Sequence, residues 1–431
     1  MTSRIAKVIG RRIWDSRGRP TVEAEVVLEG GARGRGMAPA GASRGRHEAI
    51  DLRDGGASLG GYGVARALAS LNGPIAKALA GLDASDQRCV DDALCALDGT
   101  PTKSRLGGNA TIAASMAAMH AAASHAGAPL WMYLAQGREV SLPLPEIQIF
   151  GGGAHAGRRV DIQDFLVMPV GAQSFDEALV MCAEVYRHAG TLMEQRGKRA
   201  GVADEGGWWP EFASNEEALS TLAQSIETAG YRHGEVVISL DIAASEFGAN
   251  GRYKLGLDAR ELDRDEWLAV LLDWIARYPI LSIEDPFAED DADGMRAITR
   301  ALHDRVQVIG DDFLVTNRAR VDAAAAGGAC NALLVKPNQA GTITETRSAF
   351  DAAREKGWGT IVSARSGETE DVTIVHLAVG WNCGQLKVGS FARSERMAKW
   401  NEGLRIEEAL GAKARFAGRD ALPMFRNRKG A

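Results

Sequence analysis

Residues 306–311 read VQVIGD, a short apolar run that ends in a carboxylate, and this pattern recurs between residues 237 and 388. Each run has the length of a buried strand. Segments long enough for a helix separate the runs, at residues 263–278, 291–304, 317–327 and 344–357. The polar residues at the ends of the runs are Asp241, Glu284, Asp311, Lys336, Arg365 with Ser366, and Lys387. The alternation predicts a parallel β/α barrel, whose strands carry chemistry at their C-terminal ends, so we expect these side chains to meet in one mouth.

Composition limits what this mouth can belong to. The chain has 431 residues, of which 45% are hydrophobic and 25% charged, enough for a large core. A formal net charge of -6 disfavours nucleic acid as the main partner. No run approaches the roughly 18 apolar residues of a membrane span, and the N-terminus lacks a secretory pattern, so we expect a cytoplasmic protein without a membrane partner. The five cysteines are widely spaced and lack a CxxC pair, which indicates free thiols.

The N-terminal part predicts a separate α+β cap domain. Polar and apolar residues alternate over residues 5–14 and 21–28 around the turn DSRGRP, as in an antiparallel hairpin, and a third strand is expected at 33–38. Helical spacing follows at residues 63–80, 85–97 and 108–126. The run LPLP at 142–145 disfavours helix and marks the crossing into the second domain. We therefore place the cap domain at residues 1–138 and the barrel domain at 139–431.

Three glycine-rich stretches predict loops that can approach a ligand closely: PAGASRGRH at 39–47, GGGAHAGRR at 151–159 and ADEGGWWP at 203–210. The last two stretches, and the run between them, contain His155, Gln163, Asp164 and Glu205. A single histidine in such a loop is more often a structural residue than a catalytic one. None of these residues identifies a site by itself.

Taken together, the motifs resemble those of enolase (phosphopyruvate hydratase) from one end of the chain to the other. The shared runs are DSRG (15–18), GAS (41–43), DIQ (161–163), DEGG (204–207), SIEDP (282–286), GDD (310–312), RSGETED (365–371) and ARSER (392–396). The resemblance implies a lyase that acts on 2-phosphoglycerate or phosphoenolpyruvate through lysine proton abstraction and a metal-stabilised enolate. It also implies a small α+β domain, a barrel whose first segments depart from the simple βα repeat, and a homodimer or higher even oligomer.

Asp241, Glu284 and Asp311 form an all-oxygen set that suits a hard divalent cation such as Mg²⁺. Without a cation, three converging carboxylates repel one another. Salt bridges to lysine or arginine are the alternative for any one of them. By resemblance, the three bind a first Mg²⁺, and Ser43 helps to hold a second one against the substrate phosphate.

Lys336 ends an apolar run close to Lys387, and burial and a neighbouring cation both lower the pKa of a lysine. We therefore expect a neutral amine at Lys336. By resemblance, Lys336 is the proton-abstracting base, and Lys387 stabilises the carboxylate and enolate charge. Arg365 and Ser366 match the phosphate-binding pair, in which a planar guanidinium suits phosphate oxygens.

Two departures from the family pattern fall on the side that would release the leaving group. Asp164 stands where a glutamate is expected, and Ala364 replaces a histidine, whereas Glu205 is retained; Asp164, Glu205 and His155 are the candidate catalytic residues on this side. Shortening Glu to Asp retracts the carboxylate by about one C–C bond, enough to break a direct hydrogen bond. The proton-abstraction side is thus expected to be intact and the leaving-group side altered, with Gln163 beside it as a substrate-binding residue.

Extra arginines surround the predicted mouth, and Arg44 and Arg158 are candidate substrate-binding residues. The alternative is that these two, with Arg46 and Arg159, are solvated surface residues. Trp208 and Trp209 either stack on a ring or pack the loop.

Three functions stay open. The first is a divergent enolase. The second is a specialised paralogue with a phosphonate substrate, similar to carboxyphosphonoenolpyruvate synthase of phosphonate natural-product biosynthesis. The third is a catalytically inactive binding protein. Retention of the reacting lysine, the carboxylates and the phosphate pair favours enolase chemistry.

Overall fold

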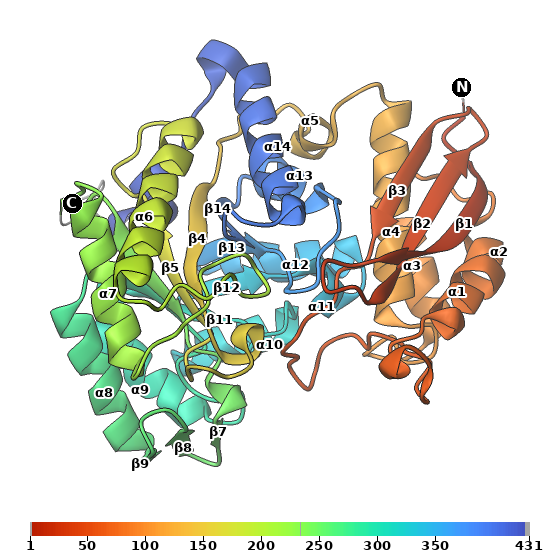
Figure 1. Cartoon of the computed structure of the whole chain (residues 1–431). Coiled ribbons are helices and arrows are strands. Elements are labelled where there is room, and N and C mark those ends of the chain that lie inside the picture. The colour runs from red at the N-terminus through yellow and green to blue at the C-terminus, as the bar shows by residue number, and fades with distance from the viewer. Residues whose placement is uncertain (1, 233, 427–431) are drawn as a thin grey trace.

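The computed structural model describes residues 2–232 and 234–426, and Figure 1 shows a smaller α+β unit beside a barrel ringed by helices. The α+β unit contains an antiparallel sheet of β1 (Ile5–Trp14), β2 (Pro20–Leu28) and β3 (Arg33–Met37). The alanine-rich helix α4 (Gly108–His125) lies directly on this sheet. A Cβ atom at Gly34 would lie 2.1 Å from the backbone N of Ala121, so only glycine permits this close approach.

The remaining helices of the cap are α1 (Ala65–Ser70), α2 (Ala76–Leu79), α3 (Gln87–Asp98) and α5 (Leu130–Ala135). The single helix expected at residues 63–80 is interrupted by a π-helical turn at Leu71–Ile75, which contains Pro74. Proline lacks the N–H that a regular α-helix needs and clashes with the preceding turn, which accounts for the interruption.

The barrel is a closed sheet of eight strands. The strands are β4 (Leu144–Gly151), β5 (Asp164–Met168), β6 (Val237–Asp241), β10 (Ile280–Glu284), β11 (Gln307–Gly310), β12 (Ala332–Val335), β13 (Gly359–Ser363) and β14 (Gly384–Gly389). All neighbours are parallel except that β5 is antiparallel to both β4 and β6. A loop of twelve residues, 152–163, joins β4 to β5 without a crossover helix, so these strands pair as a hairpin. The fold is therefore the expected modified β/α barrel with an α+β cap.

Outer helices cover the barrel. They are α6 (Phe175–Gln195), α7 (Asn215–Thr228), α8 (Arg264–Arg277), α9 (Ala292–Leu302), α10 (Arg318–Gly327), α12 (Ile343–Glu355), α13 (Thr373–Gly380) and α14 (Ser394–Leu410). Short helices α11 (Pro337–Ala340) and α15 (Pro423–Arg426) and a small sheet of β7 (Gly248–Ala249), β8 (Arg252–Leu255) and β9 (Arg260–Asp263) complete the fold. Within the described residues, we find no helix with the length and apolar character that crossing a bilayer requires.

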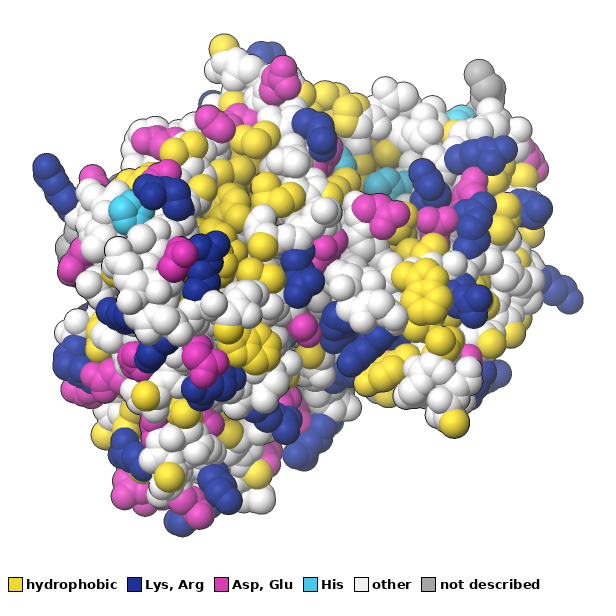
Figure 2. All heavy atoms as spheres, in the orientation of Figure 1, with side chains coloured by type: hydrophobic (Ala, Val, Ile, Leu, Met, Phe, Trp, Pro, Cys, Tyr) yellow, Lys and Arg dark blue, Asp and Glu magenta, His cyan; other side chains and the backbone are white. Residues whose placement is uncertain are grey.

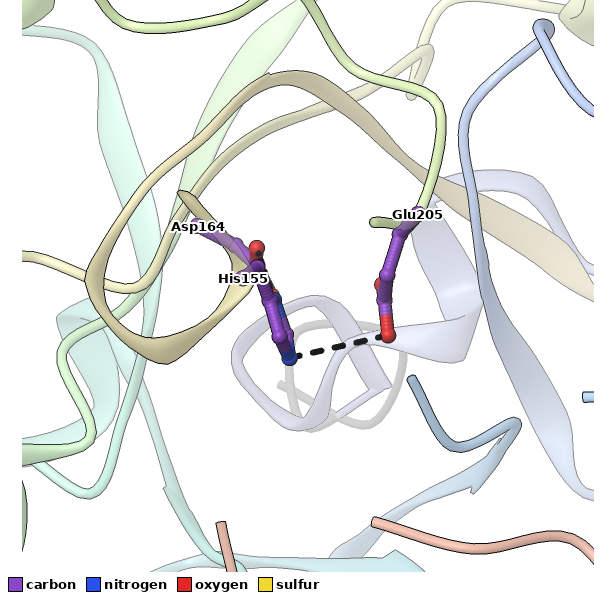
Figure 3. A group of neighbouring side chains, drawn as sticks. All are labelled: His155, Asp164 and Glu205. Carbon is purple, nitrogen blue, oxygen red and sulfur yellow. Dashed lines mark hydrogen bonds and ion pairs between the residues drawn. The ribbon is translucent and has the colours of Figure 1, made fainter. Parts of the chain in front are cut away.

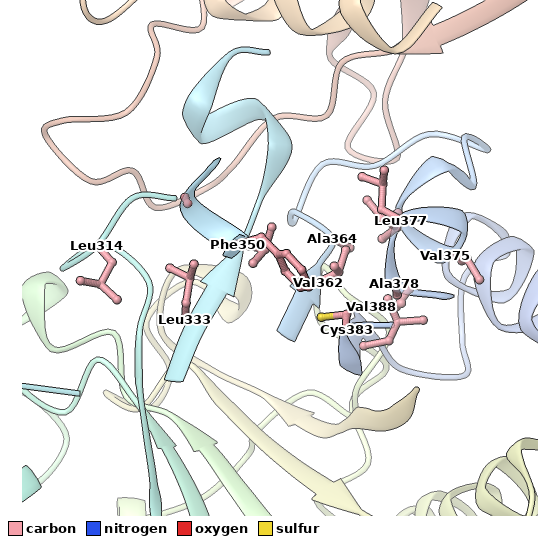
Figure 4. Close-up of a cluster of buried hydrophobic side chains, with 14 of the residues drawn as sticks. Leu314, Leu333, Phe350, Val362, Ala364, Val375, Leu377, Ala378, Cys383 and Val388 are labelled. Atoms are coloured by element: carbon pink, nitrogen blue, oxygen red, sulfur yellow. The ribbon is translucent and has the colours of Figure 1, made fainter. Parts of the chain in front are cut away.

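The apolar core lies between the barrel strands and these helices. Figure 4 shows part of it, where Leu333, Val362 and Val388 of the strands pack with Phe350 of α12 and Leu377 of α13. Burial of this apolar surface is the main stabilising contribution to such a domain.

Hydrogen bonds fix the cap to the barrel at the first turn of α12. The backbone N of Thr344 donates to Asp91 Oδ2 at 2.8 Å, and the backbone N of Ile343 donates to Ser115 Oγ at 3.0 Å. Because these N–H groups have no partner within their own helix, the cap supplies their acceptors. This contact holds the cap loops over one end of the barrel.

Candidate active site

One cavity lies where the barrel strands end and the cap loop 39–48 folds over them. Its lining residues are Gly41, Ala42, Ser43, His155, Gln163, Asp164, Glu205, Asp241, Lys336, Ser363, Ala364, Arg365, Ser366 and Lys387. The predicted mouth is therefore assembled, with two exceptions among the residues at strand ends. Glu284 and Asp311 are buried and contact the lysines of the cavity without lining it.

Both lysines of the cavity are paired with carboxylates. Lys387 Nζ donates to Asp241 Oδ2 at 2.8 Å and to Glu284 Oε2 at 2.9 Å. Lys336 Nζ donates to Asp311 Oδ2 in a short hydrogen bond. Asp241, Glu284 and Asp311 are therefore all in salt bridges with lysine in this structure, which is the alternative to metal binding.

The expected low pKa of Lys336 is wrong for this arrangement. Burial acts to lower the pKa of Lys336, but the charges of Asp311 and Glu284 together outweigh it, so the pKa lies above its ordinary value. The pKa of Lys387 is likewise raised, against the effect of burial, by Asp241 and Glu284. Both side chains are therefore ammonium groups here.

The three carboxylates do not form a compact set of metal ligands in this arrangement. Among residues 2–232 and 234–426, the groups with ligand atoms all within 4.8 Å are His155, Asp164 and Glu205, and Asp285, Asp311 and Asp312. Two observations nevertheless fit a cation near Asp241 and Glu284. Burial and the charge of Asp241 raise the pKa of Glu284 well above its ordinary range, and the buried Glu284 Oε1 has no hydrogen-bond partner. The donor set is all oxygen, as a hard divalent cation requires.

On the opposite side, His155 stands between Asp164 and Glu205 (Figure 3). His155 Nδ1 lies 2.9 Å from Asp164 Oδ1, and its Nε2 lies 3.8 Å from Glu205 Oε1. Burial acts to lower the pKa of His155, but Asp164 and Glu205 raise it to about 9. At neutral pH, His155 is therefore an imidazolium with an N–H directed toward Glu205.

The shorter side chain of Asp164 still makes direct hydrogen bonds, because Gln148 on β4 approaches it. Gln148 Nε2 donates to Asp164 Oδ1, and Gln148 Oε1 accepts from the backbone N of Gly207 at 2.8 Å. Gln148 thus joins Asp164 to the loop that carries Glu205. The second oxygen of Asp164, Oδ2, is buried without a hydrogen-bond partner and lies 3.9 Å from Lys387 Nζ.

Both terminal nitrogens of Arg365 are hydrogen-bonded to the protein. Its Nη1 donates to Glu48 Oε2 at 3.0 Å and to Asn338 Oδ1 at 3.1 Å, and its Nη2 donates to the carbonyl of Ser43 at 3.0 Å and to Glu48 Oε1 at 3.2 Å. Beside it, Ser366 Oγ accepts from the backbone N of Ala42 at 2.6 Å. The cap loop is therefore held down on the side expected to bind phosphate.

The other predicted ligand-binding residues divide into two groups. Gln163 lines the cavity, where its Nε2 donates to Asp241 Oδ2 at 3.2 Å. Arg44 is exposed and does not line the cavity, and Arg158 pairs with Glu246 at 2.6 Å outside it. The structure does not bring these two arginines to the site.

Arg46, Arg159 and Trp208 lie outside the cavity, the two arginines in ion pairs and the tryptophan packed within its loop. Arg46 and Arg159 pair with Glu289 and Glu211. Trp208 stacks on Tyr186 with ring centroids 4.7 Å apart, so it packs the loop. On the face seen in Figure 2, acidic and basic side chains are interspersed.

Sequence reasoning missed Gln148 and Glu48. Both are buried, polar and in contact with predicted site residues. A polar residue within the apolar run of β4 was a usable signal for Gln148, because buried polar groups need partners. Glu48 gave no local signal, since its partner Arg365 is 317 residues away along the chain.

Comparisons with known proteins agree with this geometry. The family model "Enolase, N-terminal domain" matches residues 5–134, and "Enolase, C-terminal TIM barrel domain" matches residues 139–424. Enolase 1 of Desulfitobacterium hafniense (strain Y51) is 48% identical over 417 residues, which cover 96% of this chain and 95% of that protein. On the fold, the site and these matches, the chain belongs to the enolase family of lyases.

Proposed function

We propose that this chain interconverts 2-phosphoglycerate and phosphoenolpyruvate with loss of water, and that it uses Mg²⁺. The observation that carries the proposal is one buried cavity in which Lys336 and Lys387 face His155, Asp164 and Glu205. Cationic and acid–base groups that line the same cavity suit removal of a proton from one carbon and of a hydroxyl group from the next.

Lys336 is the proposed base. In its neutral form, its Nζ accepts the proton from C2 of 2-phosphoglycerate, and the electron pair left behind forms the C2–C3 double bond as the C3–O bond breaks. Lys387 places a second ammonium group where negative charge develops on the substrate carboxylate. The hydrogen bond from Lys336 to Asp311 holds the side chain toward the cavity but favours its protonated form.

Asp241, Glu284 and Asp311 are the proposed Mg²⁺ ligands, and Ser43 is proposed to assist a second ion. The unpartnered Glu284 Oε1 and the repulsion between Glu284 and Asp241 support this assignment. When bound, the ion would supply positive charge that stabilises developing negative charge on the substrate. The two lysines hydrogen-bond to one oxygen each of Asp241, Glu284 and Asp311, so the ion and the ammonium groups would compete for these three carboxylates.

The leaving hydroxyl is proposed to take its proton from His155 Nε2. The pKa of Glu205 is lowered, because His155 and Arg396 outweigh the effect of burial, whereas that of His155 is raised to about 9. At neutral pH the proton therefore resides on the imidazole, and Glu205 orients it. Asp164 fixes the ring through Nδ1.

Arg365, Ser366, Ser43 and Gln163 are the proposed substrate-binding residues. Three of them surround the point where the cap loop meets β13, and the buried guanidinium of Arg365 suits phosphate oxygens. Ordering of loop 39–48 over the cavity supports a role for this loop in excluding water.

A second candidate is a specialised paralogue, such as a carboxyphosphonoenolpyruvate synthase with a phosphonate substrate. Ala364 lines the cavity with a methyl group where the family pattern has a histidine, and this observation favours a changed leaving group. We also propose the homodimer, the cytoplasmic location and the domain boundary at residues 138/139, the last supported by family matches that end at 134 and begin at 139.

The test is the absorbance of phosphoenolpyruvate formed from 2-phosphoglycerate with Mg²⁺. We expect turnover by the wild type and by the control Lys356→Ala, whose lysine pairs with Asp322 on the surface, and none by Lys336→Ala. A silent wild type that still exchanges the C2 proton with deuterium through Lys336 favours the paralogue. No turnover, no exchange and no thermal stabilisation by Mg²⁺ with phosphoenolpyruvate would indicate an inactive binding protein.

A further inference from the structure

A second cavity lies between the cap and the outer helices of the barrel, on residues that the active site does not use. This interdomain groove has a volume of about 460 Å³, within the range of small-molecule sites. Its lining comes from the start of α3, the end of α5, and helices α10 and α12. Its charged lining residues are Arg88, Arg138, Arg318, Arg347 and Asp351.

The arginines of the groove outnumber the carboxylates that neutralise them. Arg347 pairs with Asp351 at 2.7 Å, and Arg318 pairs with Glu355 at 3.1 Å. Among the described residues, the Arg138 side chain donates to the carbonyl groups of Ala135 and Leu134 and to no carboxylate. Arg88 has no carboxylate within salt-bridge distance in the part of the chain that the structure describes. The lining of the groove thus carries more positive than negative charge, although the chain as a whole has a net charge of -6.

The floor and one wall of the groove are apolar or aromatic. Met119, Ile343 and Trp381 are buried in the floor, and the half-buried ring of Tyr133 lies on the cap side. One guanidinium group can donate two parallel hydrogen bonds to two oxygens of a phosphate. An aromatic or apolar surface can pack against a planar ring. A ligand that combines several phosphate oxygens with a planar heterocycle matches both parts.

A second hollow continues the groove past Arg138. It has a volume of about 270 Å³, shares Arg138, Arg347, Asp351 and Trp381 with the first, and adds Arg354 and Glu139. The positive surface therefore extends beyond the length of a single phosphate group. This favours a ligand with a chain of phosphates over a monophosphate.

We propose that the interdomain groove binds a nucleoside di- or triphosphate, with phosphates on Arg88 and Arg138 and the base over the apolar floor. Because the lining comes from both the cap and the barrel, the bound ligand stabilises their docking. The site is separate from the proposed catalytic residues, so the inference does not depend on the proposed function.

The experiment is calorimetric titration of the full chain with ADP, without Mg²⁺, and a thermal-unfolding scan of the same samples. The test variant is Arg88→Ala/Arg138→Ala, since both side chains are exposed. The matched control is Arg187→Ala/Arg252→Ala, which removes two exposed arginines that pair with Glu184 and Glu261 elsewhere on the barrel. Adenosine and inorganic pyrophosphate are titrated separately to distinguish the two halves of the ligand.

We expect ADP to bind the wild type and the control alike, to raise the unfolding temperature of both, and to bind the test variant at least about tenfold more weakly. Adenosine and pyrophosphate should each bind more weakly than ADP. The proposal is overturned if ADP does not bind at millimolar concentration, if the test variant binds as the wild type does, or if 2-phosphoglycerate displaces ADP. Pyrophosphate binding as tight as that of ADP overturns the nucleoside part.

Discussion

Glu48 is predicted to hold the cap loop on the barrel by balancing the buried positive charge of Arg365. The variant Glu48→Gln tests this prediction. Glu48 and Arg365 are 5% and 4% exposed, and the carboxylate accepts two hydrogen bonds from the guanidinium, at 3.0 and 3.2 Å. Breaking a buried ion pair costs about 3–5 kcal/mol. Asn338 and the carbonyl of Ser43 stay bonded to Arg365, so we expect a loss at or just below the lower limit of this range, about 2–3 kcal/mol.

The assay is urea unfolding at neutral pH without substrate, with comparison of midpoints and slopes. The matched control is Glu289→Gln, which removes the partner of the exposed Arg46 in the same loop and should cost less than about 1 kcal/mol. In Glu48→Gln, inorganic phosphate should stabilise the protein more than it stabilises the wild type, because Arg365 has regained donors for an anion. Equal costs for the two variants, or equal stabilisation by phosphate, would refute the reasoning.

Three further predictions concern the cap contact and the leaving-group side. Burial raises the pKa of Asp91 from 3.8 to about 6. The folded state therefore favours the protonated carboxyl, and the free energy of unfolding should fall by roughly 3 kcal/mol as pH rises from about 4 to 6. Asp91→Asn should therefore gain stability relative to the wild type over that range in urea unfolding, and a constant difference would contradict this. Gly206 has a φ of +94°, and a Cβ atom there would lie 2.1 Å from the carbonyl O of Ala392. Gly206→Ala should therefore destabilise the protein by about 2 kcal/mol or more and displace the neighbouring Glu205. Unchanged turnover in this variant would count against the prediction. Gln148→Leu should lower the free energy of unfolding by about 2–4 kcal/mol and should lower turnover. Gln148→Glu should keep an acceptor for the backbone N–H of Gly207 but lose the donor to Asp164.

The barrel was predictable because its signals are local. A short apolar run followed by a polar residue marks a strand and also the C-terminal end of that strand. The polar residues at these ends meet at one end of a barrel, so the sequence predicts that Asp241, Lys336 and Lys387 lie close together. The reversed direction of β5 depends on the short loop before it, which periodicity does not report. The π-helical turn around Pro74 shows the same limit, because helical spacing continued through the proline.

The charge states of the site could not be predicted in the same way. Lys336 was expected to be neutral because of burial and the neighbouring charge of Lys387, but its pKa depends on which carboxylate its Nζ reaches, and Asp311 is 25 residues away. The pairing of Arg365 with Glu48 spans the two domains. Such pairings are set by tertiary contacts, and a pKa follows the contacts rather than the residue type.

The proposed leaving-group side has a connected set of hydrogen bonds in this chain. A shorter carboxylate at Asp164 would leave His155 without an orienting partner if nothing else changed, yet their separation is 2.9 Å. Gln148 reaches the same oxygen of Asp164 from β4 and, with its other end, holds the loop of Glu205, so one amide fixes both acidic groups around the imidazole. The methyl group of Ala364 leaves His155 as the one histidine among the cavity-lining residues that the structure describes. Restoring a histidine by Ala364→His would add a second base beside a site that already has a positioned proton donor. We therefore expect that variant to change the pH profile of turnover more than its maximum rate, whereas His155→Gln should abolish turnover; a large rise in maximum rate for Ala364→His would contradict the assignment of the proton to His155.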